Sequence, residues 1–257
     1  MTRNFLRIAG LIGAGLLAGC SGTTMSLMPS LEQQAALNQA SIDTPPAFNP
    51  FNDRPVTDLK PREVMANPSL EDVLKPSSDL PEMALGRADA PVVIVQYASM
   101  TCPHCRRFQA ESFPALKKEY IDTGKVRYIL RAEFPIGKQS GLATIALRCA
   151  PPDKYFQLYE KLMMDQASWV SQDVRPDPIF DVAKGYGLTR AKFDACRSDE
   201  SLVKQLNAVK ERGRTLGVIG TPNFFIQGKL VKSVITIKEI REMVDPMLAG
   251  RTAGAPR

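Results

Sequence analysis

Histidine is nearly absent from this chain: His104 is the only one among 257 residues. A structural zinc site needs about four ligands, so a site here would have to add Cys149, Cys196 or carboxylates to that one imidazole. The scarcity of histidine therefore disfavours metal chemistry, and we predict no metal site.

Long apolar runs and a strong net charge are also missing. Beyond the N-terminal stretch, no segment is long and apolar enough to span a membrane. The net charge of +6 is mild and its charges are scattered, so nucleic acid is not a predicted partner. The content of apolar residues, 44%, and of charged residues, 23%, is ordinary for a globular protein of one or two domains.

The first 19 residues have the pattern of an export signal. Arg3 and Arg7 precede an apolar run over residues 8–18 that is too short for a convincing membrane span. Leu17-Ala18-Gly19-Cys20 then resembles the processing site of bacterial lipoproteins, in which the cysteine becomes the acylated N-terminus. We predict a signal peptide over 1–19 and a lipid anchor on Cys20. The alternative is an ordinary cleaved signal with a cysteine there by chance.

Export implies an oxidising compartment, which we predict to be the periplasm. Ser21 does not resemble the common inner-membrane retention signal, so the outer membrane is slightly favoured as the site of anchoring.

Residues 20–80 differ in composition from the rest of the chain. Residues 21–80 contain eight prolines and one glycine, with many polar side chains. We predict a mostly disordered tether, with a short helical turn at 69–74. The alternative is an additional docking segment or a dimerisation arm.

The most informative motif is Cys102-Pro103-His104-Cys105. The β-branched run over 92–97 predicts a buried strand before it, and the apolar spacing over 106–120 predicts a helix after it. A thiol at a helix N-terminus is stabilised as thiolate, and a protonated His104 would add a positive charge. Pro103 fits the first helical turn, where its missing N–H costs nothing. We therefore predict that Cys102 is the nucleophile and that the more buried Cys105 resolves the mixed disulfide.

A haem site and a structural disulfide account for this motif less well. A haem attachment motif has histidine directly after the second cysteine, where this chain has Arg106. A purely structural disulfide across two residues would be strained and easily reduced, which suits catalysis better than stapling.

The rest of the chain predicts alternating helices and strands. A second strand is expected at 126–133. Apolar spacing predicts five helices, at 140–149, 153–165, 177–186, 189–197 and 199–216. A hairpin about Gly228-Lys229 and a final helix over 236–248 follow.

The motif pair Cys102-Pro103-His104-Cys105 and Gly220-Thr221-Pro222-Asn223-Phe224 resembles the DsbA-like thiol–disulfide oxidoreductases of the thioredoxin superfamily. The resemblance covers roughly residues 82–250. It implies an α/β fold in which a helical domain is inserted between the two halves of a thioredoxin-like sheet. The expected parts are residues 81–137 and 216–250 for the two halves, 138–215 for the helical insertion, and 251–257 for a disordered tail.

The resemblance also implies roles for residues outside the first motif. Thr221 and Pro222 would form a cis-proline loop that faces the active cysteines and pairs with the main chain of substrates. Cys149 and Cys196 would form a second, non-catalytic disulfide; the alternative is two buried free thiols. Gln96 stands where such enzymes often carry a buried acid that accepts the proton of the resolving cysteine. Glu133 is a candidate substitute for that acid.

These observations lead to one hypothesis and two rivals. The hypothesis is an exported thiol–disulfide oxidoreductase, lipid-anchored at Cys20, that donates disulfides to unfolded or reduced exported proteins. It would need no cofactor beyond the Cys102–Cys105 pair, and a membrane quinone-linked thiol oxidase would recharge it. The rivals are a disulfide isomerase or reductase, which a threonine before the proline would fit, and a redox-inert binding lipoprotein.

Overall fold

The computed structural model describes residues 63–253, with side chains to residue 250. The predicted signal peptide, the lipidation site Cys20 and residues 20–62 of the predicted tether lie outside the described residues.

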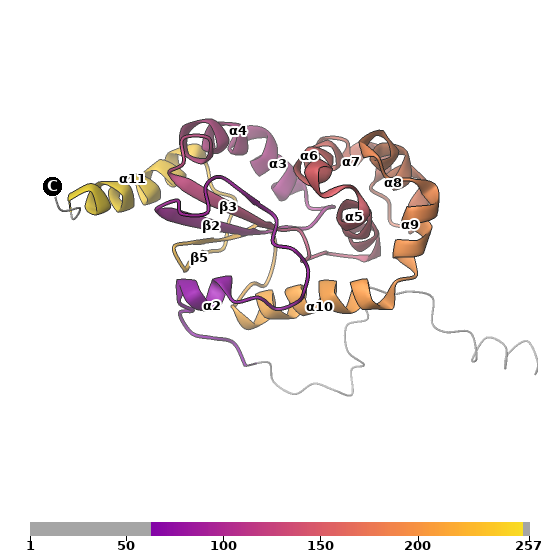
Figure 1. Cartoon of the computed structure of the whole chain (residues 1–257), viewed down its shortest axis with the longest axis horizontal. Coiled ribbons are helices and arrows are strands. Elements are labelled where there is room, and N and C mark those ends of the chain that lie inside the picture. The colour runs from indigo at the N-terminus through magenta and orange to yellow at the C-terminus, as the bar shows by residue number, and fades with distance from the viewer. Residues whose placement is uncertain (1–62, 254–257) are drawn as a thin grey trace, which may run out of the picture. The chain divides into compact units, whose positions relative to one another are not determined.

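A five-stranded sheet in the order β1-β3-β2-β4-β5 forms the centre of the fold (Figure 1). Its strands are β1 (Ala84–Leu85), β2 (Val92–Tyr97), β3 (Val126–Arg131), β4 (Asn223–Ile226) and β5 (Lys229–Val231). Only β2 and β3 are parallel, with Val92 opposite Val126, whereas the other pairs are antiparallel. The sheet is therefore a β2–helix–β3 crossover joined to a later hairpin, and buried apolar side chains of β2, β3 and β4 lie on both of its faces.

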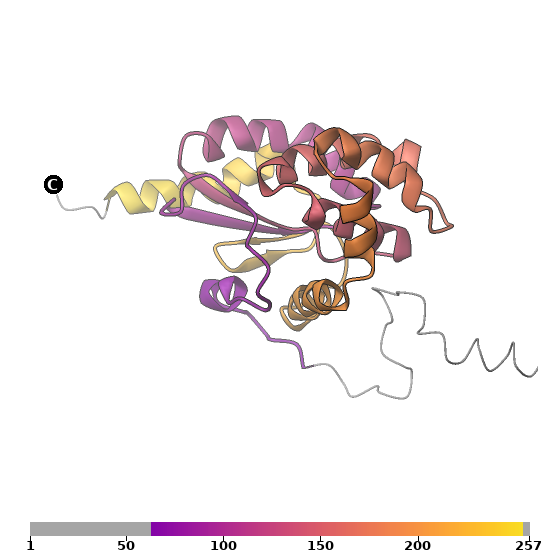
Figure 2. The ribbon, with the colours of Figure 1, turned by 45° about the vertical axis from the view of Figure 1, so that its right-hand side comes forward.

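Helices cover both faces of the sheet (Figures 1 and 2). One face carries α3 (Pro103–Glu111), α4 (Phe113–Leu116), the π-helical turn η2 (Lys117–Ile121) and α11 (Ile237–Ala253). The other face carries α2 (Leu70–Leu74) and α10 (Glu200–Thr215). Strand alternation sorts the core accordingly: Ile94 packs with Phe108 on the α3 side, and Val95 packs with Val209 on the α10 side.

The helical insertion follows β3 and leads into α10. It consists of α5 (Lys138–Cys149), η3 (Pro152–Lys154), α6 (Tyr155–Met164), α7 (Gln166–Trp169), α8 (Pro176–Ala183), η4 (Lys184–Tyr186) and α9 (Arg190–Arg197). Thr189 caps α9 by accepting a hydrogen bond from the Lys192 N–H. The fold class expected from the sequence is confirmed.

Several boundaries differ from the sequence expectation. Pro114 divides the helix predicted over 106–120, because proline fits the first turn of a helix and not its interior: α3 stops at Glu111 and α4 begins at Phe113. The hairpin turns at Gln227-Gly228, one residue early, where both residues have positive φ as a tight hairpin requires. The last helix runs to Ala253, three residues into the predicted tail.

Part of the predicted tether is folded. The Met65 N–H donates to the carbonyl of Thr215 at 2.8 Å, and Arg212 donates to the carbonyl of Asp72 at 2.6 Å. Val73 is fully buried against the α10 side of the sheet. Residues 63–80 thus form a strap over α10, because Val73 is buried in the core, with Met65, Leu74 and Leu80 packed against the same cluster. None of the described helices meets the length and hydropathy needed to cross a membrane.

Candidate active site

Both motif cysteines lie at the start of α3 at the end of β2. Cys102 is the N-cap residue and Pro103 occupies the first turn, as the sequence predicts. Cys105 follows within the first turn and is fully buried, whereas Cys102 keeps 7% of its surface exposed. Both are free thiols in this structure, which therefore describes the reduced form.

The loop before β4 lies against Cys102. The Thr221-Pro222 peptide bond is cis. The Cys102 thiol donates to the Thr221 carbonyl oxygen, with 3.2 Å between Sγ and O. The Thr221 hydroxyl is buried, and it bonds no nitrogen or oxygen atom of the described residues. The two motifs, 119 residues apart in sequence, thus meet at the reactive sulfur.

The two thiols have opposite acidities. A hydrogen bond from the Cys105 thiol, helped by the Thr221 hydroxyl and by the N–H groups of Cys105 and His104, lowers the pKa of Cys102 from 9.0 to about 5, although desolvation opposes the shift. Burial, and then the hydrogen bond to Cys102 and its charge, raise the pKa of Cys105 well above its ordinary value. Cys102 is therefore the thiolate at neutral pH, and Cys105 keeps its proton.

His104 lies on the exposed side of the first turn. Its backbone N–H contributes to the low pKa of Cys102. A role for its imidazole remains a prediction from the sequence.

Polar side chains lie beneath Cys105, on the α3 side of the sheet. Gln96 is fully buried, and its Oε1 accepts a hydrogen bond from the Tyr128 hydroxyl. Gln96 Nε2 and the Tyr159 hydroxyl have no hydrogen-bond partner within the described residues. Burial raises the pKa of Tyr128 and of Tyr159, so these hydroxyls stay protonated. The polar groups on this side of Cys105 are therefore neutral, and the charge beside it is that of the Cys102 thiolate.

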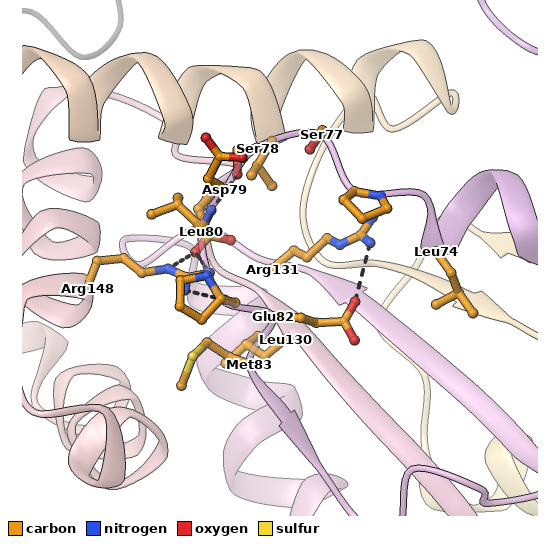
Figure 3. A pocket seen from close by; sticks show the side chains of 14 residues that line it. Leu74, Ser77, Ser78, Asp79, Leu80, Glu82, Met83, Leu130, Arg131 and Arg148 are labelled. Carbon is orange, nitrogen blue, oxygen red and sulfur yellow. Dashed lines mark hydrogen bonds and ion pairs between the residues drawn. The ribbon is translucent and has the colours of Figure 1, made fainter.

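Glu133, the candidate substitute for the missing acid, is engaged elsewhere. Arg148 Nε donates to its Oε1 at 2.6 Å, and the pair is buried. Both residues line a pocket beneath segment 76–83 (Figure 3), where Arg148 also donates to the carbonyl of Pro81 at 2.7 Å. The ion pair with Arg148 thus ties Glu133 to the helical insertion and not to Cys105.

The structure adds positioning residues that sequence reasoning missed. Gln166 in α7 donates through Nε2 to the carbonyls of Met100, at 2.8 Å, and Cys102, at 3.2 Å. Ser140 in α5 accepts the Met100 N–H at 3.0 Å. These bonds fix the catalytic turn to the helical insertion. No local pattern predicts them, because they join residues at least 40 positions apart.

The remaining cysteines lie in the helical insertion. Cys149 at the end of α5 and Cys196 in α9 are joined by a disulfide, with 6.5 Å between their Cα atoms. The pairing implied by the resemblance is thus present in the structure.

Comparison with known proteins agrees with this geometry. The thioredoxin family model matches residues 78–246. The chain belongs to the thioredoxin family.

Two curated relatives and one crystal structure illustrate the likeness. A putative protein-disulfide oxidoreductase of Rickettsia bellii is 34% identical over 57% of this chain and 57% of its own length, so the match spans little more than half of that relative. One of Rickettsia felis is 31% identical over 75% of this chain and 72% of its own length. The crystal structure of Wolbachia pipientis α-DsbA1 superposes with a TM-score of 0.64 at 26% identity, over 72% of this chain and 98% of that chain. A DsbA-like architecture thus carries a paired-cysteine site suited to thiol–disulfide exchange.

Proposed function

We propose that this protein is a thiol–disulfide oxidoreductase that donates disulfides to reduced proteins. The observation that carries the proposal is the place of Cys102 at the N-terminus of α3, beside the buried Cys105 and the Thr221 carbonyl, which accords with a pKa of Cys102 lowered to about 5 and a raised pKa of Cys105. Stabilising one thiolate stabilises the reduced form, so the oxidised form is a strong oxidant. The names of the Rickettsia relatives support the same class of reaction.

The reaction balances with no cofactor. A substrate thiolate attacks Cys102 Sγ of the Cys102–Cys105 disulfide, and the Cys105 sulfur leaves and takes up a proton. A second substrate thiolate then attacks the substrate sulfur of the mixed disulfide, and Cys102 leaves as a thiolate. Two electrons pass to the enzyme and the substrate gains one disulfide. The low pKa of Cys102 makes it a good leaving group in the second step.

Substrates would bind through their main chain at Thr221 and Pro222. The Thr221 carbonyl lies 3.2 Å from Cys102 Sγ, so a chain attached to that sulfur passes beside it. Pairing with backbone groups does not depend on side chains, which suits a range of unfolded proteins.

The decisive experiment equilibrates the Cys102–Cys105 pair with glutathione buffers. We expect a reduction potential near about −120 mV, the value of strong oxidants, together with stoichiometric oxidation of a reduced, unfolded protein. A potential near about −270 mV, the value of thioredoxin, would instead assign the protein to reduction.

Thr221 before the cis-proline fits the alternative of a disulfide isomerase. Recovery of activity from a scrambled-disulfide protein measures that alternative. A rate well above that of uncatalysed reshuffling would favour isomerisation. A redox-inert binding lipoprotein would show neither activity.

The location and partners belong to the same proposal. We propose that the protein is exported to the periplasm and anchored through acylated Cys20, at the outer membrane, and that a membrane quinone-linked thiol oxidase recharges it. Fatty-acid labelling should mark the wild type and not Cys20→Ala. Equal absence of label from both would refute the lipid anchor.

A further inference from the structure

Exposed apolar side chains gather beside the active site. Among the described residues, six large hydrophobic side chains are exposed, and three of them line one groove: Val64, Ile136 and Ile219. Their exposed fractions are 53%, 54% and 82%. Exposed apolar residues that occur singly need no explanation, whereas a cluster in a groove marks a binding surface.

Both walls of the groove are connected to residues that surround the reactive sulfur. Ile219 precedes Thr221 by two residues, and the Thr221 carbonyl contacts Cys102. On the other wall, the Thr101 hydroxyl donates to the carbonyl of Ile136 at 3.1 Å, and the Ile136 N–H donates to Ser99 Oγ at 2.9 Å. A chain that pairs with segment 219–221 therefore extends along Ile219 into the groove.

Cations accompany the apolar side chains. Lys138, Lys210 and Arg214 line the groove, and no carboxylate of the described residues lines it. Arg214 pairs with Glu211 at 2.7 Å, and Lys210 is buried. Lys138 is exposed at the start of α5, next to Ile136 on the rim. The groove is thus apolar with a net positive lining.

We propose that this groove, lined by Ile136, Ile219 and Lys138, docks an apolar and acidic unfolded segment of the reduced protein, next to the reacting cysteine. The inference rests on the proposed function and adds a substrate preference to it.

The test compares matched peptides as substrates of the full oxidised chain carrying Cys20→Ser. Each peptide contains two cysteines. An Ile-Asp-Asp or an Ile-Lys-Lys segment stands three residues before or after the first cysteine. We expect kcat/KM to be about fivefold higher for an acidic peptide, mainly through KM, because the attraction of Asp and the repulsion of Lys by the exposed Lys138 are each worth little. The preference should fall at 0.5 M salt as charges are screened.

Variants locate the preference. Lys138→Glu should abolish or invert the preference for acidic peptides, whereas Lys238→Glu, on exposed α11, should leave it intact. Ile219→Ser should raise KM for both peptides, and Val174→Ser, at an exposed position outside the groove, should not. Each peptide rate is divided by the rate at which the same variant oxidises dithiothreitol. Dithiothreitol reacts at Cys102 without contacting the groove, so the ratio corrects for changes in the chemical step.

The outcomes separate the groove from the chemistry. Equal kcat/KM for acidic and basic peptides, or a preference that persists in Lys138→Glu, overturns the groove while dithiothreitol oxidation continues. Failure of the wild type to oxidise dithiothreitol instead overturns the proposed function. A concentration-dependent dimer that disappears in Ile219→Ser would assign the groove to self-association and also overturn the proposal.

Discussion

Replacing Cys105 tests which donor makes Cys102 acidic. In the structure the Cys105 thiol is the largest contributor to the low pKa of Cys102, ahead of the Thr221 hydroxyl and the helix N–H groups. Cys105→Ala removes the donor, and Cys105→Ser keeps a hydroxyl donor at the same place. Both variants are made with Cys20→Ser, so that Cys102 is the single free thiol beside the α5–α9 disulfide.

The size of the effect follows from the charge on the acceptor. A hydrogen bond to a charged group is worth about 1.5–3 kcal/mol, which corresponds to about 1–2 units of pKa. We therefore expect the pKa of Cys102 to rise from about 5 to roughly 6–7 in Cys105→Ala. In Cys105→Ser the pKa of Cys102 should stay at about 5.

The assay is reaction with 4,4′-dithiodipyridine across pH, with ultraviolet thiolate titration beside it. At pH 5 a rise of about 1.5 units lowers the thiolate fraction about 16-fold, and the greater nucleophilicity of a more basic sulfur restores about fivefold. The alanine variant should therefore react about threefold more slowly at pH 5. At pH 8 both forms are ionised, so it should react about fivefold faster than the serine variant.

The crossing of the two pH profiles is the informative result. A pKa of about 5 in both variants, with parallel profiles, would show that the helix N–H groups and Thr221 suffice. The low pKa of Cys102 also sets how the stability of the reduced protein depends on pH. A pKa depressed by folding stabilises the reduced state above the pKa of the unfolded thiol, and that contribution disappears as the pH falls through about 5.

Three further predictions concern stability, each measured by urea unfolding. Replacing both cysteines of the α5–α9 disulfide by alanine should cost about 4 kcal/mol, since the closed loop spans a sequence separation of 47; a change below about 1 kcal/mol would contradict the value expected from chain entropy. Gly213→Ala should destabilise by about 1–3 kcal/mol, because its Cβ would lie 2.6 Å from a ring carbon of Tyr97, whereas Gly185→Ala, with open space around it, should be tolerated. Val73→Ala should destabilise by about 1–2 kcal/mol and speed proteolysis within residues 63–80; unchanged proteolysis would show that the strap does not depend on this contact.

Local sequence signals predicted the scaffold of the site well. The β-branched run over 92–97 became β2 to the residue, and the cysteine motif begins α3 with proline in its first turn. These features depend on neighbours in the sequence, which a pattern records. The bonds of Gln166 to the catalytic turn do not, because they arise only when α7 lies against the turn that precedes α3.

The proline-rich composition of residues 21–80 was misleading for residues 63–80, where a few specific contacts decide whether the segment is folded. Eight prolines over 21–80 predict disorder, yet the capping box of Ser69 and Asp72, the buried Val73 and two hydrogen bonds to α10 hold residues 63–80 in place. Arg131 and Arg148 then bind the two residues that follow the strap, the first through Glu82 at 3.8 Å and the second through the Pro81 carbonyl (Figure 3). An average over a window gives such single contacts little weight.

Gln96 shows how the structure sharpens a departure that the sequence only flagged. Strand alternation puts Gln96 on the α3 side, where its amide oxygen accepts from Tyr128. A carboxylate there would repel the thiolate of Cys102, whereas an amide does not. Glu133 is paired with Arg148, and no carboxylate of the described residues forms a hydrogen bond with Gln96, Tyr128 or Cys105. The amide at position 96 that favours a stable Cys102 thiolate thus gives the Cys105 thiol no carboxylate to accept its proton. This combination argues for a strong equilibrium oxidant in which Cys105 is slow to attack a mixed disulfide, so that the first step of disulfide donation is seldom reversed.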